Sequence, residues 1–186
     1  RELVEVAPVM GICYGMQLLA NQLGGQVKSS HHREYGHNQV MWDLDSHSFP
    51  IEGDQKIDLS ILKNIFEKNN SGKNLQKVWM SHGDIVEQPP KGTQVIAYSE
   101  SQHIASFLGH IQIKENLQRP VFAVQFHPEV VHTKNGELIL QFFVETLCAA
   151  KKEWTSQTIF DRLKELVLTK VPSDEHVLVG LSGGVD

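Results

Sequence analysis

The stretch of sequence that decides the fold is PVMGICYGMQLL, at residues 8–19. Its apolar first half predicts a short buried strand, and its second half predicts a helix that begins directly after Cys13. Gly11 and Gly15 flank this cysteine and allow the backbone to turn sharply and approach its neighbours. A helix N-terminus presents free N–H groups and a positive dipole end, which favour a thiolate over a thiol. We therefore expect Cys13 to be an activated nucleophile in a strand–turn–helix segment.

A nucleophile requires a base, because a single cysteine in such a turn is more often a buried structural residue. The sequence VFAVQFHPE at residues 121–129 predicts a buried strand with His127 at its C-terminal end. Pro128 favours an extended His127, and residues two apart in an extended segment point to the same side, so Glu129 can reach the imidazole. Taken alone, this is a strand-end histidine beside an acid. Together with Cys13 it predicts a nucleophile–base–acid triad of Cys13, His127 and Glu129.

These two stretches resemble the class I (triad-type) glutamine amidotransferases, whose marks are a G-x-C-x-G-x-Q segment and a later H-P-E. The chain carries every one of these residues, at Gly11, Cys13, Gly15, Gln17, His127, Pro128 and Glu129. Three further stretches resemble the GMP-synthesising branch of that family, namely REYG at 33–36, SHGD at 81–84 and LSGGVD at 181–186. The resemblance covers the chain except for an apparent insertion near residues 49–75.

The resemblance implies an α/β fold, a flavodoxin-like three-layer open sheet of the class I glutamine amidotransferase type. In that family a Gly-rich loop before the nucleophile strand supplies one oxyanion-hole amide, and nothing in residues 1–8 matches it. We therefore expect residues 1–150 to be an N-terminally incomplete amidotransferase domain. Residues 151–186 are expected to be a linker helix and the first strand and phosphate loop of a truncated ATP pyrophosphatase domain.

The resemblance also implies glutamine hydrolysis, in which the Cys13 thiolate attacks the carboxamide of L-glutamine and the backbone amide of Tyr14 stabilises the oxyanion. Gln17, Ser81, His82 and Asp84 are expected to bind the substrate. A helix-face glutamine without a role, and an ordinary Ser/Gly/Asp turn, are comparable alternatives for these four residues. Arg33, Glu34 and Tyr35 are interpreted as an interface or gating loop.

The end of the chain contains HVLVGL at residues 176–181, which predicts a strand, followed at once by Ser-Gly-Gly. Small residues after a strand let consecutive N–H groups converge on a phosphate, although a lone Ser-Gly-Gly would be a plain glycine turn. The segment resembles the pyrophosphate loop of N-type ATP pyrophosphatases. That resemblance implies ATP binding at Ser182, Gly183, Gly184, Val185 and Asp186. It also implies ATP, Mg²⁺ and xanthosine monophosphate for the full-length enzyme, no cofactor for the glutaminase domain, and a homodimer as one option.

Bulk properties are typical of a cytoplasmic enzyme. The chain has 186 residues, 40% of them hydrophobic and 21% charged, which is enough for one core and part of a second. A net charge of −5 argues against nucleic acid or an anionic membrane as a partner. Cys13 and Cys148 do not make a disulfide framework, and Cys148 is interpreted as a core residue on a helix. The histidines match no familiar zinc spacing, so no metal site is expected.

Hydrophobic periodicity predicts the remaining elements. Helices are expected from Cys13 to Leu23, at 57–66, around 138–147, and along an apolar stripe at 159–167 bounded by Thr155-Ser156 and Pro172. Strands are expected at 26–30, 39–42, 78–80, 93–98, 104–108, 111–113 and 121–126. Loops are expected at 33–38 and 69–74, and residues 81–84 are expected to follow a strand end.

Two other classes of function stay open. The chain could be another cysteine hydrolase, such as a γ-glutamyl hydrolase, or another class I amidotransferase; the H-P-E segment and the Ser-Gly-Gly-Val-Asp tail argue against the hydrolase. It could instead be a non-catalytic amidotransferase-like module that regulates a partner domain. The complete set of triad residues argues against that second alternative.

Overall fold

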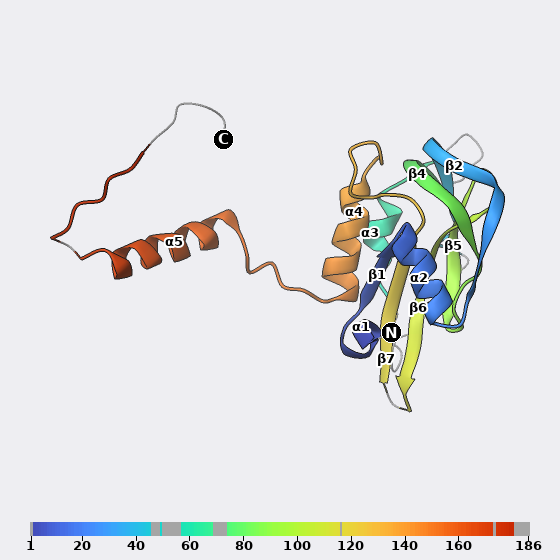
Figure 1. Ribbon diagram of the computed structural model, residues 1–186, viewed down its shortest axis with the longest axis horizontal. Coiled ribbons are helices and arrows are strands. Elements are labelled where there is room, and N and C mark those ends of the chain that lie inside the picture. Colours follow the sequence, from blue (N-terminus) through green and yellow to red (C-terminus); the bar gives the residue numbers. More distant parts are fainter. Residues whose placement is uncertain are drawn as a thin grey trace. The chain divides into compact units, whose positions relative to one another are not determined.

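The computed structural model describes residues 2–45, 49, 57–68, 74–115, 117–172 and 174–180. The chain divides into two units, Arg1–Ala150 and Lys151–Asp186 (Figure 1). The first unit holds helices α1 (Glu2–Val6), α2 (Tyr14–Gln22), α3 (Ser60–Lys63) and α4 (Gly136–Gln141) and the π-helix η1 (Phe142–Leu147). Its strands are β1 (Val9–Ile12), β2 (Gln26–Trp42), β3 (Glu67–Lys68), β4 (Asn74–Gln88), β5 (Thr93–Ser99), β6 (Ile104–Lys114) and β7 (Leu117–Val124).

The seven strands in the described part of this unit form one sheet, in the order β1-β7-β6-β5-β2-β4-β3. Only β1 and β7 are parallel to each other among the described neighbours, with Gly11 opposite Ala123 and Ile12 opposite Val124. Parallel neighbours have their carboxyl ends at the same edge of a sheet. The residues that follow β1 and β7, Cys13 and 125–129, therefore leave the sheet at one place.

Strand β7 is buried on both faces, as a central strand between two helical layers must be. Phe122 and Val124 pack in one hydrophobic cluster with Ile139 and Phe142, which belong to α4 and η1. The alternating residues Val121 and Ala123 pack in a second cluster, which contains side chains from α1 and α2. Figure 1 shows α4 and α2 on either side of β1 and β7. The three-layer α/β architecture predicted from the sequence is thus confirmed.

The described part of the apparent insertion belongs to the first of these clusters. Its buried apolar side chains are Phe49, Ile57, Leu59, Leu62 and Ile65. The helix predicted at 57–66 is only four residues long, α3, but Leu62 on it is fully buried. The segment therefore completes one side of the core. Residues 50–56 and 69–73 of the insertion lie outside the described residues.

Two of the predicted loop positions are wrong. Residues 33–38, expected as a loop, lie inside β2, because Glu34 through Asn38 pair with His82 through Val78 of β4. For the same reason residues 81–84 lie inside β4 and not after its end. The irregularity falls a few residues earlier, where the register of β2 shifts between Ser29 and Glu34. These polar segments are therefore part of the sheet, because they pair with each other across β2 and β4.

Other expectations hold with changed boundaries. The helix after Cys13 is confirmed and ends at Gln22, just before Gly24 with its φ of 85°. The strands predicted at 104–108 and 111–113 form the single strand β6. The helix predicted around 138–147 becomes α4 followed by η1, and it ends at Leu147. Cys148 comes after that end and is exposed, so its predicted place in the core is wrong.

The second unit contains helix α5 (Ser156–Lys170), whose N-terminus is closed by a capping box between Thr155 and Thr158. No residue of this helix is buried. The strand predicted at 176–181 is wrong for 176–180, which have no regular secondary structure. A strand needs a hydrogen-bonded neighbour, and the described part of this unit offers none. The predicted phosphate-loop residues 182–186 lie outside the described residues. None of the helices in the described ranges is long and apolar enough to cross a membrane.

Candidate active site

Cys13 occupies a sharp turn between β1 and α2. Its φ of 51° and ψ of −111° are unfavourable for a residue with a side chain. Backbone hydrogen bonds on both sides hold this conformation: Cys13 N donates to Val124 O at 2.9 Å, and Met16 N donates to Cys13 O at 3.0 Å. Strained backbone of this kind is typical of a nucleophile presented at the edge of a sheet.

The two glycines beside Cys13 have different roles. A Cβ on Gly11 would lie 2.7 Å from Gly15 O, so only glycine lets the first turn of α2 approach β1. A Cβ on Gly15 would meet nothing within 4 Å. The predicted close approach is confirmed for Gly11, and it is wrong for Gly15, which faces open space beside the cysteine.

The sulfur of Cys13 lies between a carbonyl and an amide. Its thiol donates to Ser81 O at 3.5 Å, and Gln125 Nε2 donates to Sγ at 3.9 Å. Burial raises the pKa of this thiol and the Glu129 charge adds to the rise, whereas the Tyr14 N–H and the Gln125 amide act in the opposite direction. The Tyr14 N–H at the helix N-terminus acts in the expected direction on the pKa of Cys13, but burial acts more strongly in the opposite one.

His127 and Glu129 form the contact that the sequence predicts. His127 Nδ1 lies 2.7 Å from Glu129 Oε1. A carboxylate only accepts, so Nδ1 carries the proton and Nε2 remains to exchange one. The backbone of His127 is fixed as well, because its N–H donates to Trp79 O at 3.0 Å on β4. Glu129 also lies near enough to Cys13 to influence the pKa of its thiol.

The residues predicted to bind substrate separate into two groups. Ser81 and Asp84 have exposed side chains, and their backbone carbonyls contact Cys13 Sγ and the Gln17 amide. Gln17 and His82 are buried. Gln17 Nε2 donates to Asp84 O at 2.8 Å and to Gln125 Oε1 at 3.2 Å, so both of its N–H groups are already paired. Whether any of the four contacts a substrate stays a prediction.

Two site residues were missed by sequence reasoning. Gln125 contacts the sulfur, and its signal is a polar residue two positions before His127 within an apolar strand, where i and i+2 share a side. Glu34, interpreted as part of an interface or gating loop, is buried, with Oε2 at 2.9 Å from His82 Nε2. A carboxylate inside a buried strand pair has no local sequence signal, because its burial depends on register.

Comparison with known proteins decides the family. The sequence profile described as "Glutamine amidotransferase class-I" matches residues 1–147. The chain belongs to the class-I glutamine amidotransferase family.

Curated relatives agree with this assignment. The chain is 44% identical over 185 residues to "GMP synthase [glutamine-hydrolyzing]" of Bdellovibrio bacteriovorus, covering 100% of this chain and 30% of that protein. It is 41% identical over 179 residues to the protein of the same name from Paraburkholderia phymatum, covering 96% of this chain and 30% of the relative. The chain thus spans about a third of the length of these relatives.

A solved structure has the same fold. It is the crystal structure described as "a putative gmp synthase subunit a protein" from Thermoplasma acidophilum, which matches with a TM-score of 0.55 at 23% identity and covers 85% of this chain and 61% of that one. At this identity the match supports the fold alone. The first unit therefore has the class I amidotransferase fold, which the sequence predicts.

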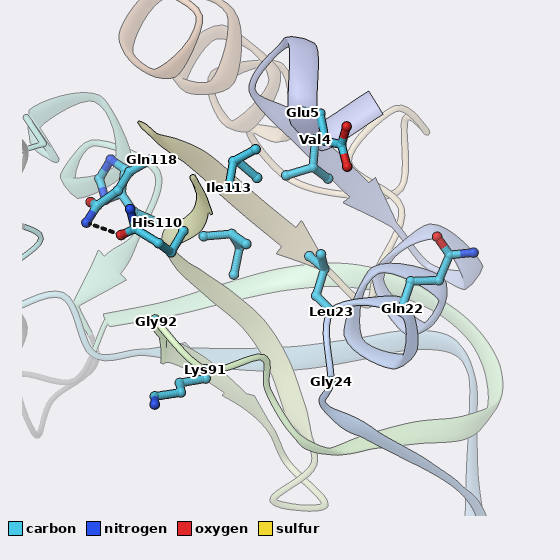
Figure 2. A pocket seen from close by; sticks show the side chains of 12 residues that line it. Val4, Glu5, Gln22, Leu23, Gly24, Lys91, Gly92, His110, Ile113 and Gln118 are labelled. Carbon is cyan, nitrogen blue, oxygen red and sulfur yellow. Dashed lines mark hydrogen bonds between the residues drawn. The ribbon is translucent and has the colours of Figure 1, made fainter. Parts of the chain in front are cut away.

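The amidotransferase site does not coincide with the cavity of about 640 Å³ shown in Figure 2. That cavity is lined by Gln22, Leu23 and Gly24 at the C-terminal end of α2, together with residues from α1, the β4–β5 turn and the β6–β7 hairpin. Cys13 precedes the other end of α2, about 13 Å away along a nine-residue helix. The catalytic residues expected from the sequence are therefore placed at the carboxyl ends of β1 and β7, outside this cavity.

Proposed function

We propose that this amidotransferase hydrolyses L-glutamine with Cys13 as nucleophile, His127 as general base and acid, and Glu129 as its orienting carboxylate. The observation that carries the proposal is that Cys13 directly follows β1 and His127 closely follows β7, the parallel neighbour of β1. Cys13 is bonded through its backbone to Val124 O at 2.9 Å, and three residues later His127 holds Glu129 at 2.7 Å. A nucleophile, a base and an orienting acid from adjacent strand ends are the components of a catalytic triad.

The first half of the reaction makes an acyl-enzyme. His127 Nε2 takes the thiol proton while Sγ attacks the side-chain carbonyl carbon of glutamine, and the carbonyl oxygen becomes an oxyanion. The Tyr14 N–H, directed at the sulfur, is the donor that this chain offers to that oxyanion. The tetrahedral intermediate then collapses: the C–N bond breaks, His127 gives its proton to the leaving nitrogen, and ammonia departs from a γ-glutamyl thioester.

The second half restores the enzyme. His127 removes a proton from water, the hydroxide attacks the thioester carbon, and the C–S bond breaks to release glutamate and regenerate the Cys13 thiol. Burial raises the pKa of that thiol, so in this proposal His127 removes the proton as the sulfur attacks. The reaction therefore depends on a base with a fixed tautomer, which the Glu129 carboxylate supplies.

We further propose that the full-length protein uses the ammonia to aminate xanthosine monophosphate to GMP at the expense of ATP. The support is that the relatives named glutamine-hydrolysing GMP synthase align with 96–100% of this chain. In this proposal Ser182, Gly183, Gly184, Val185 and Asp186 form the start of an ATP-binding loop, and Mg²⁺ accompanies the ATP. These five residues lie outside the described part of the chain, so the support for them is the sequence alone.

The test is glutamate release and GMP formation by the full-length protein and its Cys13→Ala variant. The variant should lose glutamine hydrolysis and glutamine-dependent GMP formation but retain GMP formation from added ammonia. Cys148→Ala is the matched control, because Cys148 is exposed and far along the chain from the triad, and it should keep both activities. A glutamine-analogue electrophile should label Cys13 alone of the two. Glutamine hydrolysis by Cys13→Ala would contradict the nucleophile, and a lack of GMP formation from ammonia would contradict the synthetase half.

A further inference from the structure

A group of polar side chains is buried beside the active site, between β2, β4, α2 and β7. The exposed fractions are 4% for Glu34, 5% for His82, 8% for Gln17 and 1% for Gln125. Burial of so many polar groups is costly unless each is hydrogen-bonded. Here one ion-pair contact and a series of hydrogen bonds connect these side chains to the sulfur of Cys13.

The first link is a buried ion pair. His82 Nε2 lies 2.9 Å from Glu34 Oε2, and His82 Nδ1 lies 3.0 Å from Asp84 O. A carbonyl only accepts, so Nδ1 donates to Asp84 O, and the ion-pair contact places Nε2 against the Glu34 carboxylate. Burial alone would raise the pKa of Glu34, but hydrogen bonds from His82 and Ser99 and the charges of His82 and His103 lower it to about 2.

The second link runs from Asp84 to the nucleophile. The same carbonyl, Asp84 O, accepts from Gln17 Nε2 at 2.8 Å, and Gln17 Nε2 also donates to Gln125 Oε1 at 3.2 Å. Because the oxygen of the Gln125 amide is held by this donor, its nitrogen must point the other way. That nitrogen donates to Cys13 Sγ at 3.9 Å. The Asp84 carbonyl thus orients the Gln17 amide, and Gln17 orients the Gln125 amide, while the Glu34–His82 pair contacts the same carbonyl.

We propose that Gln125 is a fixed N–H donor to the Cys13 sulfur, and that Glu34, His82 and Gln17 are positioning residues that hold its amide in this orientation. The donor favours the negative charge that the sulfur carries as the thiol proton leaves. The proposal deepens the glutamine-hydrolysis site and rests on Cys13 being its nucleophile. It gives the REYG and SHGD segments a shared role, because Glu34 and His82 are directly opposite each other on β2 and β4.

A metal site and a purely stabilising ion pair each account less well for the buried group. Within the described residues no group of three His, Cys, Asp or Glu side chains is arranged to hold a metal ion. A purely stabilising ion pair would account for a pH-dependent fold but not for the contacts that lead from Asp84 O to the Cys13 sulfur. A positioning role makes a prediction that neither of these makes, namely that the reactivity of Cys13 changes when Glu34 is altered.

The test measures alkylation of Cys13 by iodoacetamide against pH in the full-length protein, with the Cys13 peptide followed by mass spectrometry. Only the thiolate reacts, so loss of a donor moves the profile to higher pH. Gln125→Leu and Glu34→Gln should each lower the alkylation rate at pH 7 by about tenfold. The charged or titratable groups around Cys13 are His127 and Glu129 after β7, His82 and Asp84 on β4, and Tyr14 on α2, and both variants retain all of them.

Gln76→Leu is the matched control, because Gln76 is another buried glutamine with both amide ends bonded, to Trp42 and to Lys134 O. It lies outside the chain of contacts and should leave the alkylation rate within about twofold. If Gln125→Leu fails to fold, Gln125→Met replaces it, since an unbranched side chain of similar length keeps the packing.

The double variant Glu34→Gln/Gln125→Leu decides whether Glu34 acts through Gln125. If it does, the double variant should react no more slowly than Gln125→Leu alone. The proposal would be overturned if the two single effects on the alkylation rate multiply in the double variant. It would also be overturned if the pH profile of Glu34→Gln is unchanged, or if Gln76→Leu changes the alkylation rate equally. Because alkylation needs no glutamine, absence of glutaminase activity in the wild-type protein would reject the proposed function without deciding this result.

Discussion

At the scale of single residues, the site depends on a few positions with an unusual backbone conformation or a specific side-chain contact. Cys13 adopts a positive φ that its backbone bonds to Val124 and Met16 enforce. His127 has one ring nitrogen committed to Glu129 and the other left for chemistry. In the proposed triad the imidazole would therefore transfer protons, and the carboxylate would orient it.

We expect His127→Asn to lower the rate of glutamine hydrolysis by about 10² to 10⁴-fold, which is the usual loss for a positioned acid–base group. Glu129→Gln should cost much less. Glu129 is half exposed, and an amide oxygen can still accept the Nδ1 proton. Steady-state glutamate release from the two variants measures the difference. His127→Asn activity within a factor of two of wild type would refute the triad.

Gly11 and Gly15 provide a matched pair for the elbow. Gly11→Ala should lower the free energy of unfolding by about 1 to 3 kcal/mol, because its Cβ would contact Gly15 O and Leu19 Cδ1, each at 2.7 Å. Gly15→Ala has open space within helix α2 and should raise stability by about 0.5 to 1 kcal/mol. Urea denaturation of the three proteins is the measurement. Equal effects at the two positions would mean that the elbow does not depend on close approach at Gly11.

At the scale of elements, strands β2 and β4 contain two segments whose secondary structure was predicted wrongly. Polar segments that look like loops, 33–38 and 81–84, are cross-strand partners with one buried side. Their pairing puts Glu34 against His82 in the interior while the side chains of Ser81 and Asp84 stay exposed. A charge that is buried in this way must make the stability of the fold depend on pH.

The pKa of Glu34 is lowered from its ordinary value of 4.5 to about 2, so the folded state favours the carboxylate. Its contribution to stability is therefore complete above about pH 4.5 and is lost as the pH falls towards 2. The loss should be of the order of 3 kcal/mol. Unfolding free energies of wild type and Glu34→Gln across this range measure it, with the variant expected to show a flatter acid limb. Parallel curves would place the acid sensitivity elsewhere.

At the scale of the whole molecule, the amidotransferase unit and the segment that follows it differ in how they bury side chains. The first unit has two apolar clusters on opposite faces of its sheet, whereas α5 buries none of its residues. The exposed apolar side chains of α5 include Leu163 and Leu166, which are spaced for one helix face. We expect this face to matter in the full-length protein if, as proposed, glutamine hydrolysis supplies ammonia for synthesis.

We expect the full-length protein to hydrolyse glutamine slowly alone and faster with ATP and xanthosine monophosphate. Leu163→Gln/Leu166→Gln should weaken this stimulation without changing basal hydrolysis, because neither residue belongs to the proposed triad. Lys164→Gln, on another face of α5, is the control and should keep the stimulation. Glutamate release with and without both nucleotides is the assay. Equal stimulation in the double variant would remove α5 from the coupling route, and no stimulation in wild type would end the idea.

The sequence by itself determined the parts of this protein that depend on local pattern. The turn at Cys13, the strand that precedes His127, the helices α2 and α5 and the family all follow from spacing and residue type along short segments. Even the His127–Glu129 contact is local, because the two residues are neighbours in an extended segment.

Only the tertiary structure decided what depends on strand register and burial. Register placed Glu34 opposite His82, joined Gln17 to Asp84 O, and turned the Gln125 amide towards the sulfur. Burial raises the pKa of the Cys13 thiol, whereas the two N–H donors lower it. The effect of burial is the larger one, because removal of water disfavours the charged thiolate. Gln17 contacts Asp84, 67 positions away, and Gln125 contacts Cys13, 112 positions away. No local sequence pattern predicts such contacts, because only the folded arrangement of the strands and α2 brings these residues together.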